Sequence, residues 1–429
     1  MTNSYFPHWR LHQRGTIAPD ERLPWPQTIA LGAQHVVAMF GATVLAPLLM
    51  GFDPNIAILM SGVGTLVFFV ITGGRVPSYL GSSFAFIGVV IAATAYSGRG
   101  PNPNLAVALG GIVACGAVYT LIGLAVIAGG TRWVERLMPP VVTGSVVAVI
   151  GLNLGPVAVH NANASTFEGV MAVVTILCVG GIAVFTRGRL QRLPILLGLV
   201  LAWILYALAT NGLAMGKPID VAAVAAAAWL GVPHFAQPVF TWDAIALIAP
   251  VAIILVAENL GHLKAVSAMT ARNLDPWLGR AFAGDGIATM LSGMVGGTGV
   301  TTYAENIGVM AVTRVYSTLL FVTAALFALI LGFSPKFGAL IATVPGPVLA
   351  GVSIVVFGLI AIAGARIWVQ NQVDFSDNRN LIVAAVTLVL GAGDFSLKFG
   401  GVTLGGIGTA TFGAILLNAL FARAPRQSD

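Results

Sequence analysis

The sequence predicts an all-α polytopic membrane protein, because both its composition and the lengths of its apolar runs are typical of multi-span chains. Of its 429 residues 57% are hydrophobic and 8% are charged, whereas soluble domains carry about a quarter charged residues. A helix that spans a bilayer needs roughly 17–25 apolar residues. Cutting the chain into such runs, with a few shorter ones, predicts fourteen transmembrane segments at 28–50, 54–74, 78–96, 105–129, 141–158, 168–186, 193–210, 243–267, 281–297, 298–313, 316–333, 345–363, 380–393 and 402–421.

The chain also resembles itself, which predicts two inverted repeats of seven segments each. The stretch 140–151 resembles 347–358, and 81–85 corresponds to 301–305, both at offsets close to half the chain length. An odd number of spans in each half requires that the second half be inserted upside down. We therefore divide the chain into a cytoplasmic N-terminal tail (1–26), a first repeat (27–210), an external linker (211–241), a second repeat (242–421) and a cytoplasmic C-terminal tail (422–429).

Positively charged residues set the orientation of this predicted topology. With the N-terminus in the cytoplasm, Arg99, Lys217, Lys336 and Lys398 fall outside, and the other seventeen of the 21 Lys and Arg residues fall inside. Cytoplasmic loops of membrane proteins carry such an excess. The bias also explains the formal charge of +6, so the charge gives no reason to expect nucleic-acid binding. Both termini are predicted to be cytoplasmic.

Several classes of function lack their sequence signals. Cys115 and Cys178 lie in apolar runs without the spacing of a metal site or a disulfide framework, so we expect both to be packing residues. Nothing resembles the nucleotide-binding loop GxxxxGK followed by Ser or Thr, which argues against transport driven by ATP within this chain. No nucleophile motif such as GxSxG is evident. We expect no metal and no cofactor, with a proton as the coupling ion.

Two segments break the apolar pattern at corresponding places in the two halves. Residues 297–303 contain glycines followed by the β-formers Val, Thr, Thr and Tyr, so the chain is expected to be extended there, before a short helix over 305–313. Residues 76–86 combine proline, glycine, serines and aromatics before the apolar run 87–94. A helix with a proline start would explain the second segment alone. A pair of interrupted segments, however, points to a transporter's binding site at the bilayer midplane.

Ionisable side chains at membrane depth are a further set of candidates. Glu258 and His262 are four residues apart and therefore on one face of a helix, and Glu305 opens the second short helix. A charge at this depth is costly unless it faces a cavity or a partner, and Glu258 and His262 are also placed to pair with each other. Asp285 is expected either in a proton path or at the membrane edge. His35 is equally consistent with packing and with function.

Two deep carboxylates without an evident cation beside them suit a neutral ligand rich in N–H donors, and they suit an anion poorly. Phe84 offers a face on which a planar ring can stack, although most phenylalanines in membranes pack or face lipid. A flat ring bearing amide groups, such as a nucleobase, fits both features. Because low dielectric favours the protonated carboxyl group, Glu258, Glu305 or the Glu258–His262 pair can carry a proton, which suggests proton symport.

The stretch Glu305–Arg314, with the sequence ENIGVMAVTR, matches a known pattern: Gln, Glu or Pro, then Asn-x-Gly-x-x-x-x-Thr, then Arg, Lys or Gly. It resembles the signature of the nucleobase–ascorbate transporter family at every fixed position. The pair Gln34-His35 and the run GSSF at 81–84 also resemble that family, and the similarity extends over essentially the whole chain. The segments YLGSSFAF and ENIGV are similar to those of bacterial uracil permeases. The tail resembles the permeases associated with bacterial pyrimidine catabolism at Pro7–Trp9 and Pro19–Trp25.

The resemblance implies a fold with a core domain and a gate domain, usually in a dimer, and it implies roles for single residues. In uracil permeases the residues that match Glu258 and Glu305 hydrogen-bond the base. The residue that matches Phe84 lines the base site and offers a main-chain contact, and Tyr303 matches a tyrosine of the family. With Ser83, Phe84 would form one side of a pocket between the two extended pieces.

Proton coupling and selectivity are expected to depend on neighbouring residues. The histidine that matches His262 is linked to proton coupling in the family. Ala304 stands where close uracil permeases have glycine, so its N–H can still donate to the base while its methyl group narrows the pocket. Asn259 stands where they can have histidine. Both departures bear on the substrate range more than on the mechanism. The remaining candidates for proton coupling are Glu258, Asp285 and His35.

The sequence therefore predicts a secondary transporter of the bacterial inner membrane that imports uracil by proton symport through alternating access, with thymine and xanthine as further candidate substrates. Its expected partners are the lipid bilayer, a small nucleobase and a second copy of the chain, and no nucleic acid. A purine or xanthine permease of the same family would often have glutamine in place of Glu305. An anion transporter of related fold would need a cationic site, and a membrane-embedded enzyme is the alternative from another class.

Overall fold

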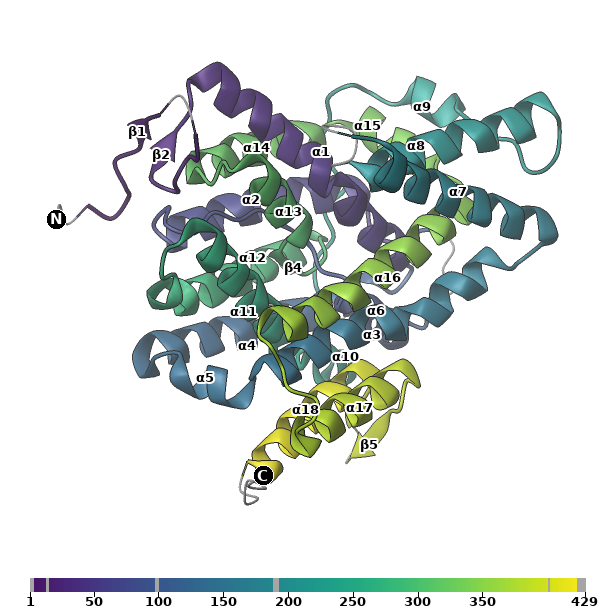
Figure 1. Ribbon diagram of the computed structural model, residues 1–429. Helices are drawn as coiled ribbons and strands as arrows, with labels where there is room; N and C mark the ends of the chain where they lie inside the picture. The colour runs from purple at the N-terminus through teal and green to yellow at the C-terminus, as the bar shows by residue number, and fades with distance from the viewer. Residues whose placement is uncertain (1–3, 13–14, 97–99, 188–192, 400–401, 423–429) are drawn as a thin grey trace.

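The computed structural model describes residues 4–12, 15–96, 100–187, 193–399 and 402–422, and there the chain is almost entirely helical (Figure 1). Of the basic residues that predict the topology, six lie outside the described residues: Arg14, Arg99, Arg189, Arg192, Arg423 and Arg426. The first half contains α1 (Trp25–Met50), α2 (Pro54–Ile71), α3 (Phe86–Thr94), α4 (Leu105–Gly129), α5 (Arg132–Leu137), α6 (Pro140–Ala162), α7 (Thr166–Phe185) and α8 (Pro194–Ala207), which continues into the π-helix η2 (Leu208–Gly212).

The linker between the predicted halves contains one short helix, α9 (Ala222–Ala226). The second half contains α10 (Trp242–Ile248), α11 (Val251–Thr270), the 3₁₀-helix η3 (Asp275–Trp277), α12 (Leu278–Val295), α13 (Ala304–Thr313), α14 (Thr318–Gly332), α15 (Pro335–Ala342), α16 (Gly346–Gln370), α17 (Asn378–Ala392) and α18 (Gly406–Phe421). Several helices, among them α1, α2, α6 and α16, carry proline in their first turn, where the missing N–H has no helical partner to lose.

The described residues form three pairs of short strands, one of which joins distant parts of the chain. β3 (Leu80–Ser82) pairs antiparallel with β4 (Val300–Thr302), with Gly81 opposite Thr301. The prediction that both interrupted segments are extended is therefore confirmed, and each strand leads into a short helix, α3 or α13. The other pairs are β1 (Arg10–Leu11) with β2 (Glu21–Arg22), which is parallel, and β5 (Leu397–Phe399) with β6 (Val402–Leu404), which is antiparallel.

The helices pack in two groups with the β3–β4 pair inside the first. In the first group α4 packs on α12, α2 packs on α12 and α14, and α1 packs on α14; in the second group α6, α7 and α8 pack with α16, and α17 and α18 pack with α6. Figure 1 shows α16 and α6 running side by side between the first group and the α17–α18 pair. The two groups match the core and gate division that the family resemblance implies.

Glycines allow the closest helix pairs to approach. A Cβ atom added to Gly123 of α4 would lie 2.4 Å from the main-chain nitrogen of Ala283 on α12, and one added to Gly151 of α6 would lie 2.2 Å from the main-chain oxygen of Phe357 on α16. Such close contacts between small residues hold helices together in a bilayer, where the hydrophobic effect does not drive one helix against another. They account for part of the unusual glycine content of the chain.

Helix contacts correspond between the two halves in the order that a seven-plus-seven repeat expects. The fourth segment of one half packs on the second of the other, as α4 on α12 and α2 on α14, and the sixth packs on the fifth, as α7 on α16 and α17 on α6. The inverted repeat and the domain limits derived from it remain predictions.

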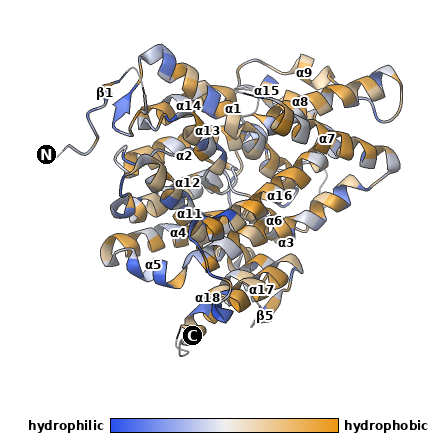
Figure 2. Cartoon of the chain, viewed as in Figure 1, coloured by the Kyte–Doolittle hydropathy of each residue, from blue (hydrophilic) through white to orange (hydrophobic). Residues whose placement is uncertain are grey.

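Eight helices in the described part of the chain are long and apolar enough to cross a membrane, or nine if α14 and α15, which meet at 81°, form one span. Each of the fourteen predicted segments contains a helix, but several are too short to meet that criterion, so the count of fourteen remains a prediction. Hydrophobic residues dominate α7, α8 and α16, whereas hydrophilic residues are prominent at β1 and α5 (Figure 2).

Candidate functional site

A cavity lies where the two helix groups meet, beside the β3–β4 strand pair. Its volume is about 60 Å³, several times the 10–15 Å³ that one water molecule needs. The first group supplies Ser82, Ser83, Phe84 and Ala85 after β3, Glu258 and His262 from α11, and Thr301, Thr302, Tyr303, Ala304 and Glu305 around the start of α13; the second group supplies Val147 and Ile150 from α6, and Ile360 and Ala363 from α16. All six residues predicted to bind substrate line this one cavity.

Main-chain hydrogen bonds extend the strand pair on both sides of the cavity. The N–H of Ser83 donates to the oxygen of Gly299 at 2.9 Å, and the N–H of Tyr303 donates to the oxygen of Tyr79 at 3.1 Å. The Tyr303 hydroxyl donates to the oxygen of Ser82 at 2.8 Å. These bonds fix the segment that carries Ser83 and Phe84 against the segment that carries Ala304 and Glu305.

The start of α13 presents main-chain donors at the cavity. The first N–H that finds a helical acceptor is that of Ile307, which donates to the oxygen of Tyr303 at 3.2 Å, so the amides of Ala304 and Glu305 belong to the unpaired first turn. The N-terminus of a helix also carries a partial positive charge. Half-helices that begin at mid-membrane depth are how secondary transporters place such donors at a substrate.

Glu258 and Glu305 supply acceptors to the same cavity from different elements. Both are partly buried, and the Oε2 atom of Glu258 has no hydrogen-bond partner among the described residues. A buried carboxylate oxygen without a partner is unfavourable and is therefore free to accept a donor from a bound molecule. None of the residues that line the cavity in the described chain is Lys or Arg, so the cationic site that an anion transporter requires is not built here.

His262 bonds to a strand residue and not to Glu258. Its Nδ1 atom lies 2.8 Å from the hydroxyl of Thr302, and that hydroxyl donates to Oδ1 of Asn259 at 3.4 Å. The alternative in which Glu258 and His262 simply pair is not what the structure shows.

Asp285 lies behind the cavity, at the far end of this chain of hydrogen bonds. Its side chain is fully buried, and its Oδ2 atom accepts from Nδ2 of Asn259 at 2.6 Å. Asn259 also donates to the hydroxyl of Tyr119 at 3.0 Å. The choice between a proton path and the membrane edge for Asp285 stays a prediction. Asp285, Asn259, Thr302 and His262 thus form one connected polar path to the cavity.

His35 does not line the cavity but touches the helix that does. Its Nδ1 atom lies 2.9 Å from Nδ2 of Asn306, the residue after Glu305, and its ring meets Phe321 edge-on at 4.9 Å. The Asn306 amide also donates to the main-chain oxygen of His35 at 3.1 Å. His35 can therefore influence Glu305 on α13 only through Asn306, the residue to which it is hydrogen-bonded.

Sequence reasoning missed two parts of the site. Thr302 lies in the extended piece that is expected to border the pocket, but nothing in the sequence singles it out as the partner of His262. The aliphatic residues Val147 and Ile150 were missed although they lie inside 140–151, the stretch that resembles 347–358. That internal resemblance was the one available signal, since it marks the helix pair α6 and α16 that faces the cavity.

An antiparallel strand pair, two half-helices and a cavity with partly buried carboxyl groups between two helix groups define the class of a secondary membrane transporter. Solved structures show the same fold. The chain is similar to the transmembrane domain of a cyanobacterial bicarbonate transporter, BicA, with a TM-score of 0.62 and 17% identity over 86% of this chain and 96% of that one. It is also similar to SLC26A9, with a TM-score of 0.64 and 12% identity over 92% of this chain and 65% of that one.

Residues 26–398 match the model of the Xan_ur_permease family, described as a permease family, and the chain belongs to this family. Over 97% of its length and 96% of the relative's, it is 69% identical to the Escherichia coli (strain K12) protein named "Putative pyrimidine permease RutG". It is 42% identical to the uracil permease of Bacillus caldolyticus, covering 94% of each chain. The chain is therefore a permease, not an enzyme.

Proposed function

We propose that this permease imports uracil together with protons across the bacterial inner membrane. The observation that carries the proposal is that Glu258 and Glu305 line one cavity with Phe84. Uracil has two ring N–H groups and two carbonyl oxygens on a flat ring. Two carboxyl groups can accept the N–H groups, the amides at the start of α13 can donate to a carbonyl, and the ring of Phe84 can stack on the base. The uracil permeases among the relatives support the same substrate.

Proton coupling in this proposal uses Glu258 and His262 at the cavity and Asp285 behind it. Two carboxyl groups that line the same small, partly buried cavity repel when both are charged, so a proton held by one of them lowers the cost of the empty site. Asn259 and Thr302 link His262 to Asp285 by hydrogen bonds. These bonds couple His262 at the cavity to the buried carboxyl group of Asp285, so a change in the protonation of one is felt by the other. His35 acts in the proposal only through Asn306.

Access to the cavity would alternate as the second helix group moves against the first. The cavity supports this proposal because both groups contribute walls to it, so relative movement must open or close it. Loops that the topology places in the cytoplasm also lie together: Asp20 of the tail pairs with Arg272 at 2.6 Å, and the amide of Asn418 on α18 reaches the main-chain oxygen of Arg136 on α5 at 3.5 Å. Both termini are therefore assigned to the cytoplasm, and a homodimer is the proposed assembly.

Thymine and xanthine are proposed as further substrates of the same site. Thymine differs from uracil by one methyl group and keeps both ring N–H groups. Xanthine presents the same arrangement of two carbonyls and two N–H groups on its six-membered ring but needs more room. The small volume of the cavity and the methyl group of Ala304 favour the single ring, which places a purine second.

The test is uptake of radiolabelled uracil into proteoliposomes with an imposed inward proton gradient, comparing the wild type with Glu305→Gln. We expect uptake that collapses with a protonophore and falls at least about a hundredfold in the variant, as removal of a charged hydrogen-bonding partner at a substrate does. Glu168→Gln, the same change in the first turn of α7, is the matched control and should transport normally. Unlabelled thymine and xanthine are added as competitors.

The outcomes separate the parts of the proposal. Uptake that does not depend on the proton gradient would contradict the proposed proton coupling but not the proposed substrate site. Competition by xanthine that exceeds competition by uracil itself would reassign the chain to purines. Equal uptake by the wild type and Glu305→Gln would remove Glu305 from the substrate site.

A further inference from the structure

The walls of the cavity differ sharply in chemistry. Every lining side chain with a hydrogen-bonding atom comes from the first helix group. The second group contributes only aliphatic side chains, Val147 and Ile150 from α6, and Ile360 and Ala363 from α16. We call these four residues the aliphatic wall. It borders the same cavity as the carboxyl groups of Glu258 and Glu305, but from the other helix group.

This asymmetry orients a pyrimidine ring. Burying a polar group against an aliphatic surface without a hydrogen bond is unfavourable by about 1–3 kcal/mol in proteins. Atoms N1, C2, N3 and C4 of uracil carry all of its donors and acceptors, whereas C5 and C6 carry only hydrogen. The polar edge therefore turns to the first helix group, and the C5–C6 edge turns to the aliphatic wall.

We propose that the aliphatic wall is the element that selects the substituent at C5 of the pyrimidine, with Ile360 and Ala363 setting its size limit. This inference rests on the proposed function, since it assumes a pyrimidine held by the two glutamates. Uracil, with hydrogen at C5, and thymine, with methyl, differ only at the edge that faces the wall. The wall also excludes polar C5 substituents, which would find no hydrogen-bond partner there.

The position of α16 is set by contacts around the wall and not by the substrate alone. Phe357, one turn before Ile360, meets the ring of Phe84 edge-on, with centroids 6.0 Å apart and planes at 85°. Gly144 and Gly151 of α6 lie so close to α16 that an added Cβ would fall within 2.3 Å of Trp368 and 2.2 Å of Phe357. A rigid frame of this kind lets the size of a side chain at Ile360 or Ala363 determine the free space.

An aliphatic wall also suits a surface that moves. Contacts between apolar groups are non-directional, so α6 and α16 can slide past the bound ring without breaking a hydrogen bond. All directional contacts stay on the first helix group, which carries the ring as one body. Selection at C5 and movement of the second group therefore use the same four side chains.

The test measures kcat/KM for uracil and thymine uptake into proteoliposomes in three variants. Ile360→Ala enlarges the space, and Ala363→Leu fills it; both positions are only partly buried, so folding is expected to survive. Because one methyl group in an apolar pocket changes specificity about tenfold or more, the thymine-to-uracil ratio should rise about tenfold in Ile360→Ala and fall about tenfold in Ala363→Leu. Ile362→Ala makes the same change on the outer face of α16, where the side chain is 60% exposed, and should leave the ratio unchanged.

The two levels of the proposal fail separately. If the wild type takes up uracil but the ratio stays constant in both wall variants, the C5 edge does not face α16 and the inference is wrong. If all variants including Ile362→Ala shift the ratio alike, the effect is general and not a property of the wall. If the wild type takes up neither pyrimidine, the proposed function itself fails.

Discussion

The Tyr303 hydroxyl donates a hydrogen bond to the main-chain oxygen of Ser82, 2.8 Å away, from one interrupted segment to the other. Thr43 of α1 donates to the same hydroxyl at 3.2 Å. Tyr303 precedes Glu305 by two residues, and Ser82 precedes Phe84 by two. The buried Tyr303 hydroxyl thus adds a side-chain bond to the main-chain bonds that join the two segments that carry the predicted substrate contacts.

Tyr303→Phe should lower stability and weaken ligand binding together. The variant keeps the ring but leaves the Ser82 oxygen and the Thr43 hydroxyl without their partner, and a buried polar group left unpaired costs about 1–3 kcal/mol. Thermal unfolding in detergent, with and without uracil, measures both effects, because a ligand that binds only the folded state raises its stability. We expect a lower midpoint and a smaller shift on adding uracil.

Tyr5→Phe is the matched control for this prediction. Tyr5, in the N-terminal tail, is 50% exposed, and its hydroxyl donates to the main-chain oxygen of Val70 at 2.8 Å. The loss of an exposed hydrogen bond should leave the midpoint nearly unchanged. An unchanged midpoint in Tyr303→Phe as well would show that the two segments are held by their main-chain bonds alone.

The sequence predicted the polar half of the candidate site because charged residues are rare in an apolar chain. Glu258 and Glu305 stand out for that reason, and the glycine-rich, β-forming composition around Thr301 marks the strand. The aliphatic wall was not predictable in this way. Val147 and Ile360 have the same side chains as residues that face lipid or pack inside the bundle, so only their position in space distinguishes them.

Partner choice was also beyond sequence reasoning. Helical spacing placed His262 next to Glu258, whereas the structure gives it Thr302, because β4 passes closer to the imidazole than the preceding turn of α11 does. Asp285 finds Asn259 on another helix, 26 residues away in sequence. Such choices depend on how helices pack, which periodicity within one helix does not encode.

Two glycines near the site are expected to respond in opposite ways to alanine. A Cβ atom at Gly81 would lie 2.5 Å from the ring of Tyr303 and 2.6 Å from the Thr43 hydroxyl, whereas one at Gly308 of α13 would meet nothing within 4 Å. Gly81→Ala should therefore separate the strands and cost about 1–3 kcal/mol, as overpacking does. Gly308→Ala should stabilise the helix by about 0.5–1 kcal/mol.

Unfolding midpoints of the two glycine variants, with uracil uptake measured in parallel, check this contrast. We expect Gly308→Ala to be folded and active although Gly308 belongs to the family signature. A folded Gly308→Ala protein without uptake would contradict the expectation and assign this glycine a role in movement. A fully active Gly81→Ala protein would show that β3 and β4 can move apart without loss.

The N-terminal tail should detach from the protein at acidic pH. The Glu21 carboxylate accepts from the N–H of Ala18 at 2.9 Å and lies 3.0 Å from His12. The hydrogen bond from Ala18 makes the largest contribution to lowering the pKa of Glu21 below its ordinary value, and the contact with His12 makes the next largest lowering contribution. Because this pKa is lowered, the charged carboxylate stabilises the docked tail fully at pH values above the ordinary pKa of about 4.3. That stabilisation is lost as the pH falls through the lowered pKa of the docked state.

Amide hydrogen exchange of the tail at pH 7 and near pH 3 measures the effect. The docked tail is anchored by Ile17, whose N–H donates to Arg314 at 2.9 Å and whose oxygen accepts from Tyr316 at 2.8 Å. Protection of these amides should fall at low pH in the wild type. Glu21→Gln should show weaker protection at pH 7 and little further change, and a variant that keeps the wild-type pH profile would assign it to another group.

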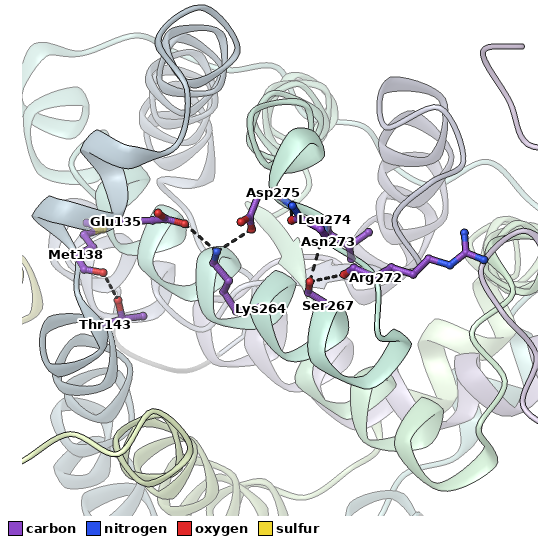
Figure 3. A network of polar contacts seen from close by, with 9 residues as sticks. All are labelled: Glu135, Met138, Thr143, Lys264, Ser267, Arg272, Asn273, Leu274 and Asp275. Atoms are coloured by element: carbon purple, nitrogen blue, oxygen red, sulfur yellow. Dashed lines mark hydrogen bonds and ion pairs between the residues drawn. The ribbon is translucent and has the colours of Figure 1, made fainter. Parts of the chain in front are cut away.

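An ion-pair network near the end of α11 should influence the rate of transport. Lys264, two residues after His262, lies 2.8 Å from Glu135 and 2.7 Å from Asp275 (Figure 3). Glu135 is on α5, which connects the first helix group to α6 of the second, whereas Asp275 stays within the first group. The three side chains are 37–45% exposed, so each pair is worth about 0.2–1 kcal/mol.

Glu135→Gln should therefore change the maximal uptake rate by up to about fivefold with little change in KM, and the effect should vanish at high salt. Asp275→Asn removes a pair of the same strength that does not cross between the groups, and it should alter the rate much less. Equal rate changes in the two variants would mean that the network only supports the end of α11 and takes no part in the movement between the groups.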